Sequence, residues 1–254
     1  MSKTMSVEEL VEHCENAAYS LKKLLLTLSN SQCEKMKKRA MLIAYWVNTY
    51  VRYIRSEDSF SPESVFKLKR GAVVRVEFGY RVGRELGGRH YAMVVDSNNS
   101  IYRNTVTVVP LGSLKEIAPK DDYSVILADG VFGAVSKKVN AVIEEAERTE
   151  KEADSMNSKI EEAQEADKPA IRIVQRQKYQ MAKELLASTN KWQDEINHLK
   201  QGTVAKVDQI TTVSKMRISQ PLNKEHPLYG IRLTPQDMNM IDTKLHKLYF
   251  NNHE

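Results

Sequence analysis

Apolar residues near the start of the chain recur at alternating steps of three and four positions, which is the period of an amphipathic helix. Two stripes of this kind are separated by Ser29-Asn30. Their members are Leu10, Cys14, Ala17, Leu21, Leu24 and Leu28, followed by Met36, Ala40, Ile43, Val47 and Ile54. The residue pairs with capping-box spacing are Ser6 with Glu9 and Ser31 with Glu34. The pattern predicts two antiparallel helices that end at the polar run 56–62.

From residue 72 onward the period changes to short runs rich in β-branched and aromatic residues, separated by glycine, asparagine and serine. The predicted strands are 72–78, 91–95, 105–110, 124–127, 203–207 and 211–213. Several short strands at this spacing favour a small β-barrel or a strongly bent sheet. Thr234-Pro235 then begins a final amphipathic helix.

Two long helical stripes interrupt the β pattern. Their members are Val135, Val139, Val142, Ala146, Thr149, Ala153, Met156, Ile160 and Ala163, then Ile171, Val174, Met181, Leu185, Trp192, Ile196 and Leu199. The two helices are nearly equal, about 45 Å each at a rise of 1.5 Å per residue, so the chain returns to where it left. We expect an inserted antiparallel coiled-coil hairpin that can be excised without unfolding the β domain. The stripes, with Trp192 on the return helix, are expected either to leave surface for a partner helix from a second subunit or another protein, or to form a self-contained arm packed against residues 7–54.

These patterns predict an α+β protein. Its parts are an N-terminal helical hairpin and linker (1–66), a β domain (67–133 plus 201–254) and the inserted helical hairpin (134–200).

Composition narrows the class of protein. Hydrophobic residues make up 41% and charged residues 28%, as in soluble globular proteins. No apolar run reaches the roughly 20 residues of a membrane span, and the acidic, polar start does not resemble a signal peptide. Cys14 and Cys33 are each placed on the apolar face of a predicted helix, so we expect buried free thiols and a cytoplasmic protein. The net charge of +5 is concentrated in the β segments, which suits a polyanionic substrate but is also common on solvated surfaces.

Five segments of the β domain resemble, in order, the motifs of PemK/MazF-type toxins, a family with a small SH3-like β-barrel. They are Arg70-Gly71, the loop Gly83-Arg84-Glu85-Leu86-Gly87-Gly88, the strand Arg89-His90-Tyr91-Ala92-Met93-Val94-Val95, the segment Val108-Val109-Pro110-Leu111-Gly112-Ser113, and Val207-Asp208-Gln209-Ile210-Thr211-Thr212-Val213. The resemblance covers fewer than half of the residues and leaves out 1–66 and 134–200.

The resemblance implies metal-independent cleavage of single-stranded RNA, in which the ribose 2′-hydroxyl attacks the adjacent phosphate. Such a reaction needs a proton acceptor, a proton donor and stabilisation of charge on phosphate. The matching positions assign catalysis to Glu85, His90, Arg89 and Ser113. They assign RNA binding to Arg81, Arg84, Gln209 and Asp208. The family further implies a homodimer and a cognate antitoxin, which are the two expected sources of the partner helix.

Two departures fall on the site itself. His90 stands where the family usually has a catalytic arginine, and Gly112 stands where it has a threonine, with Ser113 one residue later. Histidine exchanges protons near neutral pH, and Arg89 beside it supplies a fixed charge. In the alternative, His90 only packs at a strand edge and catalysis has been lost. The protein would then be a non-catalytic binding protein, either a gyrase inhibitor on the same barrel or a helical scaffold.

Other chemistries have little support in the sequence. The remaining histidines show no metal-ligand spacing with cysteine or carboxylate residues, so we expect neither a metal nor another cofactor. Gly87-Gly88 lacks the strand-to-helix context of a phosphate-binding loop. Trp46 and Trp192 lie on helical faces and are expected to pack in the core rather than stack on bases.

Overall fold

The computed structural model describes residues 5–114, 123–128, 130–198 and 202–250. The chain forms two compact units. The helical unit consists of Met1–Phe60 together with Gly79–Gly88, and the sheet unit consists of Ser61–Phe78 together with Arg89–Glu254. The loop 79–88 therefore belongs to a different unit from the two strands that it connects.

The helical unit contains α1 (Val7–Ser29) and α2 (Glu34–Ser56), as the two stripes predicted. The first capping box is confirmed, because Ser6 Oγ accepts from the backbone N–H of Glu9 and the Glu9 carboxylate accepts from that of Ser6. The second predicted capping box, Ser31 with Glu34, is wrong. Cys33 is the residue that caps α2, without a side-chain hydrogen bond, and Glu34 begins the helix instead of standing at its third position.

The core of the helical unit is small. Its buried residues are Leu28, Ala40 and Ile43, and the residues packed against them are Leu21, Leu25, Val47 and Tyr80. The α1 members lie in its second half and the α2 members lie between Ala40 and Val47, whereas Tyr80 comes from the loop 79–88. Cys14 and Cys33 are exposed, so the prediction that they are buried is wrong. Cys14 lies in the first half of α1, whereas the members of its stripe that join the core, Leu21 and Leu28, lie in the second half.

The sheet unit is built on an antiparallel sheet of seven strands. These are β1 (Val73–Glu77), β2 (Arg89–Val94), β3 (Thr105–Ser113), β4 (Ser124–Leu127), β5 (Thr203–Lys206), β6 (Thr211–Ser214) and β7 (Ile218–Gln220). The strand order is β4-β5-β3-β2-β1-β7, with β6 paired to β3 as well. Six of the strands match predicted runs and β7 was not predicted. An α+β fold is thus confirmed, whereas closure into an SH3-like barrel stays a prediction.

Strand β3 is long enough to hold partners on both edges. One edge pairs with β2 from Val108 to Leu111. The other edge pairs first with β6, from Thr105 to Val108, and then with β5, from Leu111 to Ser113. A 3-10 turn, η2 (Val207–Gln209), lies between β5 and β6 and lets the chain pass from one part of that edge to the next.

A buried lysine fixes the connection between β2 and β3. Lys215 is fully buried, and its ammonium donates to the backbone carbonyls of Ser100 and Ile101 at 2.7 and 3.3 Å. Burial lowers the pKa of Lys215, because the charged form loses contact with water. The two carbonyls compensate part of this cost and tie the connection to the segment before β7.

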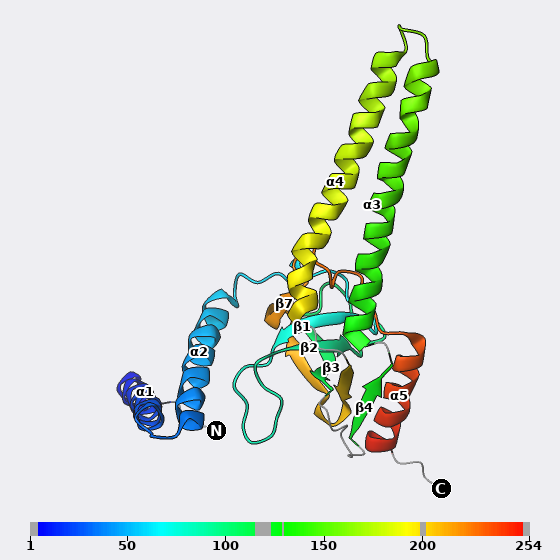
Figure 1. Cartoon of the computed structure of the whole chain (residues 1–254). Helices are drawn as coiled ribbons and strands as arrows, with labels where there is room; N and C mark the ends of the chain where they lie inside the picture. The colour runs from blue at the N-terminus through cyan, green and yellow to red at the C-terminus, as the bar shows by residue number, and fades with distance from the viewer. Residues whose placement is uncertain (1–4, 115–122, 129, 199–201, 251–254) are drawn as a thin grey trace. The chain divides into compact units, whose positions relative to one another are not determined.

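The inserted segment forms α3 (Gly130–Glu162) and α4 (Lys168–His198), which pack side by side as a projecting arm (Figure 1). Their direction is antiparallel, since Lys178 forms an ion pair with Glu152 and Gln175 donates to the carbonyl of Ala153. The α4 residues buried in the arm are Ala182, Thr189 and Trp192. Val174 and Met181 are exposed, so the predicted α4 stripe mixes two faces. Leu199 and the side chain of Ile196 lie outside the described residues.

The base of the arm is part of the core of the sheet unit. Val131, Val135, Val139 and Trp192 join one buried cluster with strand residues such as Leu111. The indole N–H of Trp192 donates to the carbonyl of Glu225 at 2.7 Å, and the Lys138 ammonium lies 5.0 Å from the centre of the indole ring. Trp192 is therefore a core residue, as predicted from its helical face. Its expected role as free surface for a partner helix is wrong.

The last helix, α5 (Pro235–Tyr249), begins as predicted. Thr234 caps it by accepting from the N–H of Asp237. The Asp237 side chain is fully buried and accepts from the N–H of Ala128, which holds the chain just after β4. Within the described ranges, no helix is long and apolar enough to cross a membrane.

We expect the arm to tolerate shortening at its tip but not removal at its base. The Lys178–Glu152 pair places Thr149 and Met181 at about the same level of the arm. Replacing residues 150–180 by a short Gly-Ser link should leave the urea midpoint nearly unchanged, because loop-closure cost depends only weakly on length. Replacing residues 134–200 should abolish cooperative unfolding, because it removes Val135, Val139 and Trp192 from the core.

Trp192→Ala is the matched point variant. Truncating a buried aromatic residue costs about 3–5 kcal/mol, a large share of the roughly 5–15 kcal/mol that stabilises a typical domain. Met181→Ala, at an exposed position of the same helix, is the control and should cost little. A stable, cooperatively unfolding protein without residues 134–200 would contradict this account.

Candidate functional site

A pocket opens where β2 and β3 separate. The two strands are paired up to Tyr91 and Leu111. Beyond that pair, Arg89 and His90 continue in register with β1, whereas Gly112 and Ser113 continue with β5. The gap between the diverging strands holds a cavity of about 210 Å³. The register of the sheet thus places the first residues of β2 opposite the last residues of β3.

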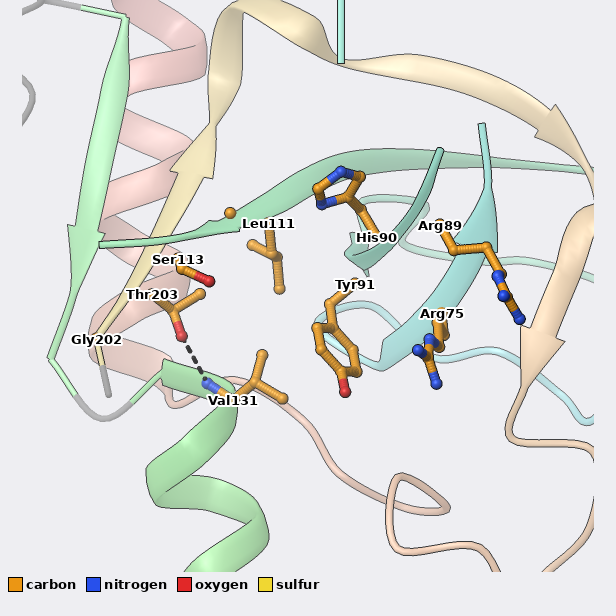
Figure 2. Close-up of a pocket in the computed structure, with 10 residues that line it drawn as sticks. Arg75, Arg89, His90, Tyr91, Leu111, Ser113, Val131, Gly202 and Thr203 are labelled. Carbon is orange, nitrogen blue, oxygen red and sulfur yellow. Dashed lines mark hydrogen bonds between the residues drawn. The ribbon is translucent and has the colours of Figure 1, made fainter. Parts of the chain in front are cut away.

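The walls of the pocket come from four strands and the start of α3. The described lining residues are Arg75, Arg89, His90, Tyr91, Leu111, Gly112, Ser113, Val131, Gly202 and Thr203. Figure 2 shows the side chains of Tyr91, Leu111 and Val131 around a common space, while the His90 ring points to the other side of β2. This follows from the strand period of two, which sends neighbouring residues to opposite faces.

Two arginines give the pocket a positive character. The Arg75 guanidinium lies 5.8 Å from the centre of the Tyr91 ring, a cation–π distance, and the two residues are cross-strand partners. Arg89 lies 3.7 Å from the Glu77 carboxylate, but its side chain keeps 63% of its surface exposed against 17% for Glu77. Arg89 therefore retains most of its hydration and can still approach an anionic ligand.

His90 is the titratable group of the lining whose ordinary pKa is nearest neutrality. It is half-buried on β2, paired with Val76 of β1. His90 is among the residues that line the cavity, although its ring lies on the opposite side of β2 from the Tyr91 ring (Figure 2). The role of His90 in proton transfer stays a prediction.

Gly112 and Ser113 differ from each other in what they offer the site. A Cβ on Gly112 would meet no atom within 4 Å, so the position that carries threonine in the family is open space here. Ser113 is exposed and lines the pocket. As neighbours on a strand, residues 112 and 113 point to opposite faces. The Ser113 hydroxyl consequently approaches the cavity from a different side than a threonine at 112 would.

The far wall of the pocket is the junction between β5 and α3. Thr203 Oγ1 accepts from the N–H of Val131 at 3.1 Å, in the first turn of α3 (Figure 2). Gly130 has a φ of +58°, and a Cβ there would collide with Thr203. Glycine is therefore required for this close approach.

The predicted loop residues belong to the helical unit. Glu85 and Arg84 are exposed, and Arg81 is partly buried. The Arg81 guanidinium lies 3.4 Å from the Glu85 carboxylate, four residues away along the loop. An exposed pair of this kind contributes about 0–1 kcal/mol to stability.

Asp208 and Gln209 do not line the pocket. They lie in η2, where the backbone N–H of Asp208 faces the carbonyl of Tyr123 at 3.4 Å. Burial raises the pKa of Tyr249 on α5, and the charge of Asp208 raises it further. These two residues therefore stand beside β4 and α5 rather than at the gap between β2 and β3.

Of the eight predicted site residues, the pocket brings together His90, Arg89 and Ser113. Sequence reasoning missed Arg75, Tyr91 and Thr203. Arg75 had a signal, as a charged residue inside the apolar run 72–78. No feature of the sequence indicated Thr203, because its hydrogen bond with the start of α3 depends on α3 beginning beside β5. In the described part of the chain, no three His, Cys, Asp or Glu side chains are grouped so that they could hold a metal ion.

Comparison with known proteins identifies one family. Residues 69–172 match the model of the PemK-like, MazF-like toxins of type II toxin-antitoxin systems. The match includes the loop, β2, β3 and α3, and it ends in α4, so residues 207–213 fall outside it. No curated protein matches the chain. The segment that supplies most of the pocket wall thus carries the signature of the PemK-like, MazF-like toxins of type II toxin-antitoxin systems, over residues 69–172 of the chain.

Proposed function

We propose that this protein is a toxin that cleaves single-stranded RNA, as an endoribonuclease that needs no metal ion. The observation that carries the proposal is the family match across a pocket with two arginines, a histidine and three hydroxyl side chains. The described lining includes no carboxylate. Such a lining favours a phosphodiester, because cations and hydroxyl donors stabilise phosphate oxygens without a competing negative charge.

In the proposed reaction the ribose 2′-hydroxyl attacks the adjacent phosphate, leaving a cyclic phosphate and a 5′-hydroxyl. His90 transfers a proton in this step, since imidazole both accepts and donates protons near neutral pH. Arg89, supported by Arg75, stabilises the charge that develops on phosphate. Ser113 donates a hydrogen bond from the β3 side of the gap. Glu85 is assigned as the second acid–base group through the family resemblance.

The remaining assignments concern binding and partners. Arg81 and Arg84 are proposed to hold the RNA backbone from the loop. Asp208 and Gln209 are proposed to contact nucleotides away from the scissile bond, because they lie outside the pocket wall. A cytoplasmic homodimer with a cognate antitoxin is the assembly that the family supports.

The first prediction is cleavage of a long single-stranded RNA in the presence of a chelator. Because His90 and the arginines supply proton transfer and charge, removal of divalent metal should not lower the rate. End-group analysis of the products should find cyclic phosphate and 5′-hydroxyl ends. Strict dependence on added magnesium would contradict the mechanism. Inactivity on RNA combined with trapped gyrase cleavage complexes would instead support a non-catalytic inhibitor.

The second prediction concerns the acid–base groups. His90→Ala and Glu85→Ala should each lower kcat by about 100-fold or more, a typical contribution of a positioned acid or base. His90→Arg, which restores the family residue, should retain part of the activity. His246→Ala, an exposed histidine on α5, is the matched control and should be silent. Unchanged turnover in His90→Ala would remove His90 from the mechanism.

The third prediction uses the open space at residue 112. Gly112→Thr should fold with unchanged or higher stability, because a Cβ at this position meets no atom within 4 Å and threonine favours strands. The new hydroxyl restores a donor that the family uses, so kcat should rise, and it should also rescue Ser113→Ala. Thermal unfolding and RNA cleavage measure the two effects. A fall in cleavage by the stable variant would show that the substrate itself occupies this space.

A further inference from the structure

The β1–β2 loop, residues 79–88, is packed into the helical unit rather than the sheet unit. Chain continuity would place it with β1 and β2, from which it extends directly. Instead the loop contacts α2, through Tyr80 with Arg39 and through Gly79 with Trp46. The loop also carries Arg81, Arg84 and Glu85, the residues that the proposed function assigns to RNA. The residues that hold the loop against the helices therefore fix the conformation of the segment that carries these three side chains.

Tyr80 is the principal anchor. Its ring packs against the buried cluster of Leu28, Ala40 and Ile43 between α1 and α2. Its hydroxyl accepts a hydrogen bond of 2.7 Å from Nε of Arg39 on α2. Packing of the ring and the hydrogen bond at its end together fix the position and the orientation of the Tyr80 side chain.

The neck of the loop is closed against a second aromatic residue. Gly79 has a φ of +75°, and a Cβ there would stand 2.5 Å from the indole of Trp46. The N–H of Gly88 donates to the carbonyl of Gly79 at 2.7 Å, joining the two ends of the loop. Glycine is needed at residue 79 because the backbone is left-handed and lies directly on the Trp46 ring.

We propose that Arg39, Trp46 and Tyr80 are positioning residues for RNA cleavage, which hold the β1–β2 loop in its productive conformation. The inference rests on the proposed function, since the loop matters only if Glu85 and the loop arginines act on RNA. It assigns the N-terminal helices a role in the reaction, although they lie outside the matched family segment. A loop ordered in advance does not have to be immobilised when substrate binds, which removes an entropic cost from each turnover.

The test compares variants of the full-length protein by two independent measurements. Hydrogen exchange of the peptide covering residues 79–88 reports how firmly the loop is held. Steady-state cleavage of RNA reports kcat and KM. Tyr80→Ala removes the ring and the hydroxyl, whereas Tyr80→Phe and Arg39→Gln remove only the hydrogen bond. The matched controls are Tyr45→Phe and Lys38→Gln, which change exposed residues of the same helix.

Tyr80→Ala should accelerate exchange of the loop while α1 and α2 stay protected, and it should lower kcat/KM by about 100-fold, as small misplacements of catalytic groups do. Tyr80→Phe and Arg39→Gln should lower it by about threefold to tenfold, in line with one hydrogen bond. KM should rise together with the fall in kcat, because the loop carries both binding and acid–base groups. A smaller folded fraction would lower kcat alone.

Three results would overturn the proposal. Unchanged exchange of the loop in Tyr80→Ala would show that Tyr80 does not hold it. Faster exchange with unchanged cleavage would show that the anchored conformation is irrelevant to the reaction, and a rise in cleavage would show that the anchor inhibits. If the unmodified protein fails to cleave RNA, the proposed function falls and the positioning role falls with it. In that case the exchange data still decide whether the helices hold the loop.

Discussion

The pairing of β3 along both edges is the constraint on which the sheet unit depends. One edge carries β2, and the other carries β6 and β5 in succession. Because β2 stops pairing at Leu111 while β5 continues to Ser113, the sheet must open at this point, and the pocket occupies the opening. The same pairing fixes Thr203 beside the start of α3. The site is thus a consequence of register rather than of a separate binding element.

The arm is inserted in sequence but integral in packing. Both of its ends contribute to the buried cluster of the sheet unit, through Val135 and Val139 from α3 and Trp192 from α4. The Lys138 ammonium reaches the carbonyls of Pro227 and Tyr229, and its pKa is lowered by burial. Burial removes water from the Lys138 ammonium, and the two carbonyls replace part of that hydration. The same hydrogen bonds hold the segment before α5 to the arm. Beyond Ile143, the described residues of α3 are not part of this cluster, and the arm is held by contacts between its own two helices.

Local signals in the sequence predicted much of the fold. The Ser6–Glu9 capping box, the β4 run and the Thr234 cap act between near neighbours, and each is where the sequence placed it. The errors concern distant partners. Cys14 was assigned to a core because its stripe is regular, but the α1 residues of the α1–α2 core lie between Leu21 and Leu28, and Cys14 is exposed. In the site, His90, Arg89 and Ser113 were found by motif, whereas Thr203 and Tyr91 depend on strand register.

Tyr80 shows most clearly why sequence continuity is a poor guide to physical association. It stands two residues before Val82, in a loop whose flanking strands form one sheet, yet its side chain completes the core between α1 and α2. The loop has few apolar residues with which to form a core of its own. Its packing therefore depends on the aromatic ring and the hydrogen-bonded hydroxyl of Tyr80. The helices outside the family segment and the loop inside it therefore share one core. A change in one must be accommodated by the other, and for this reason the N-terminal helices cannot be treated as a neutral addition to the loop.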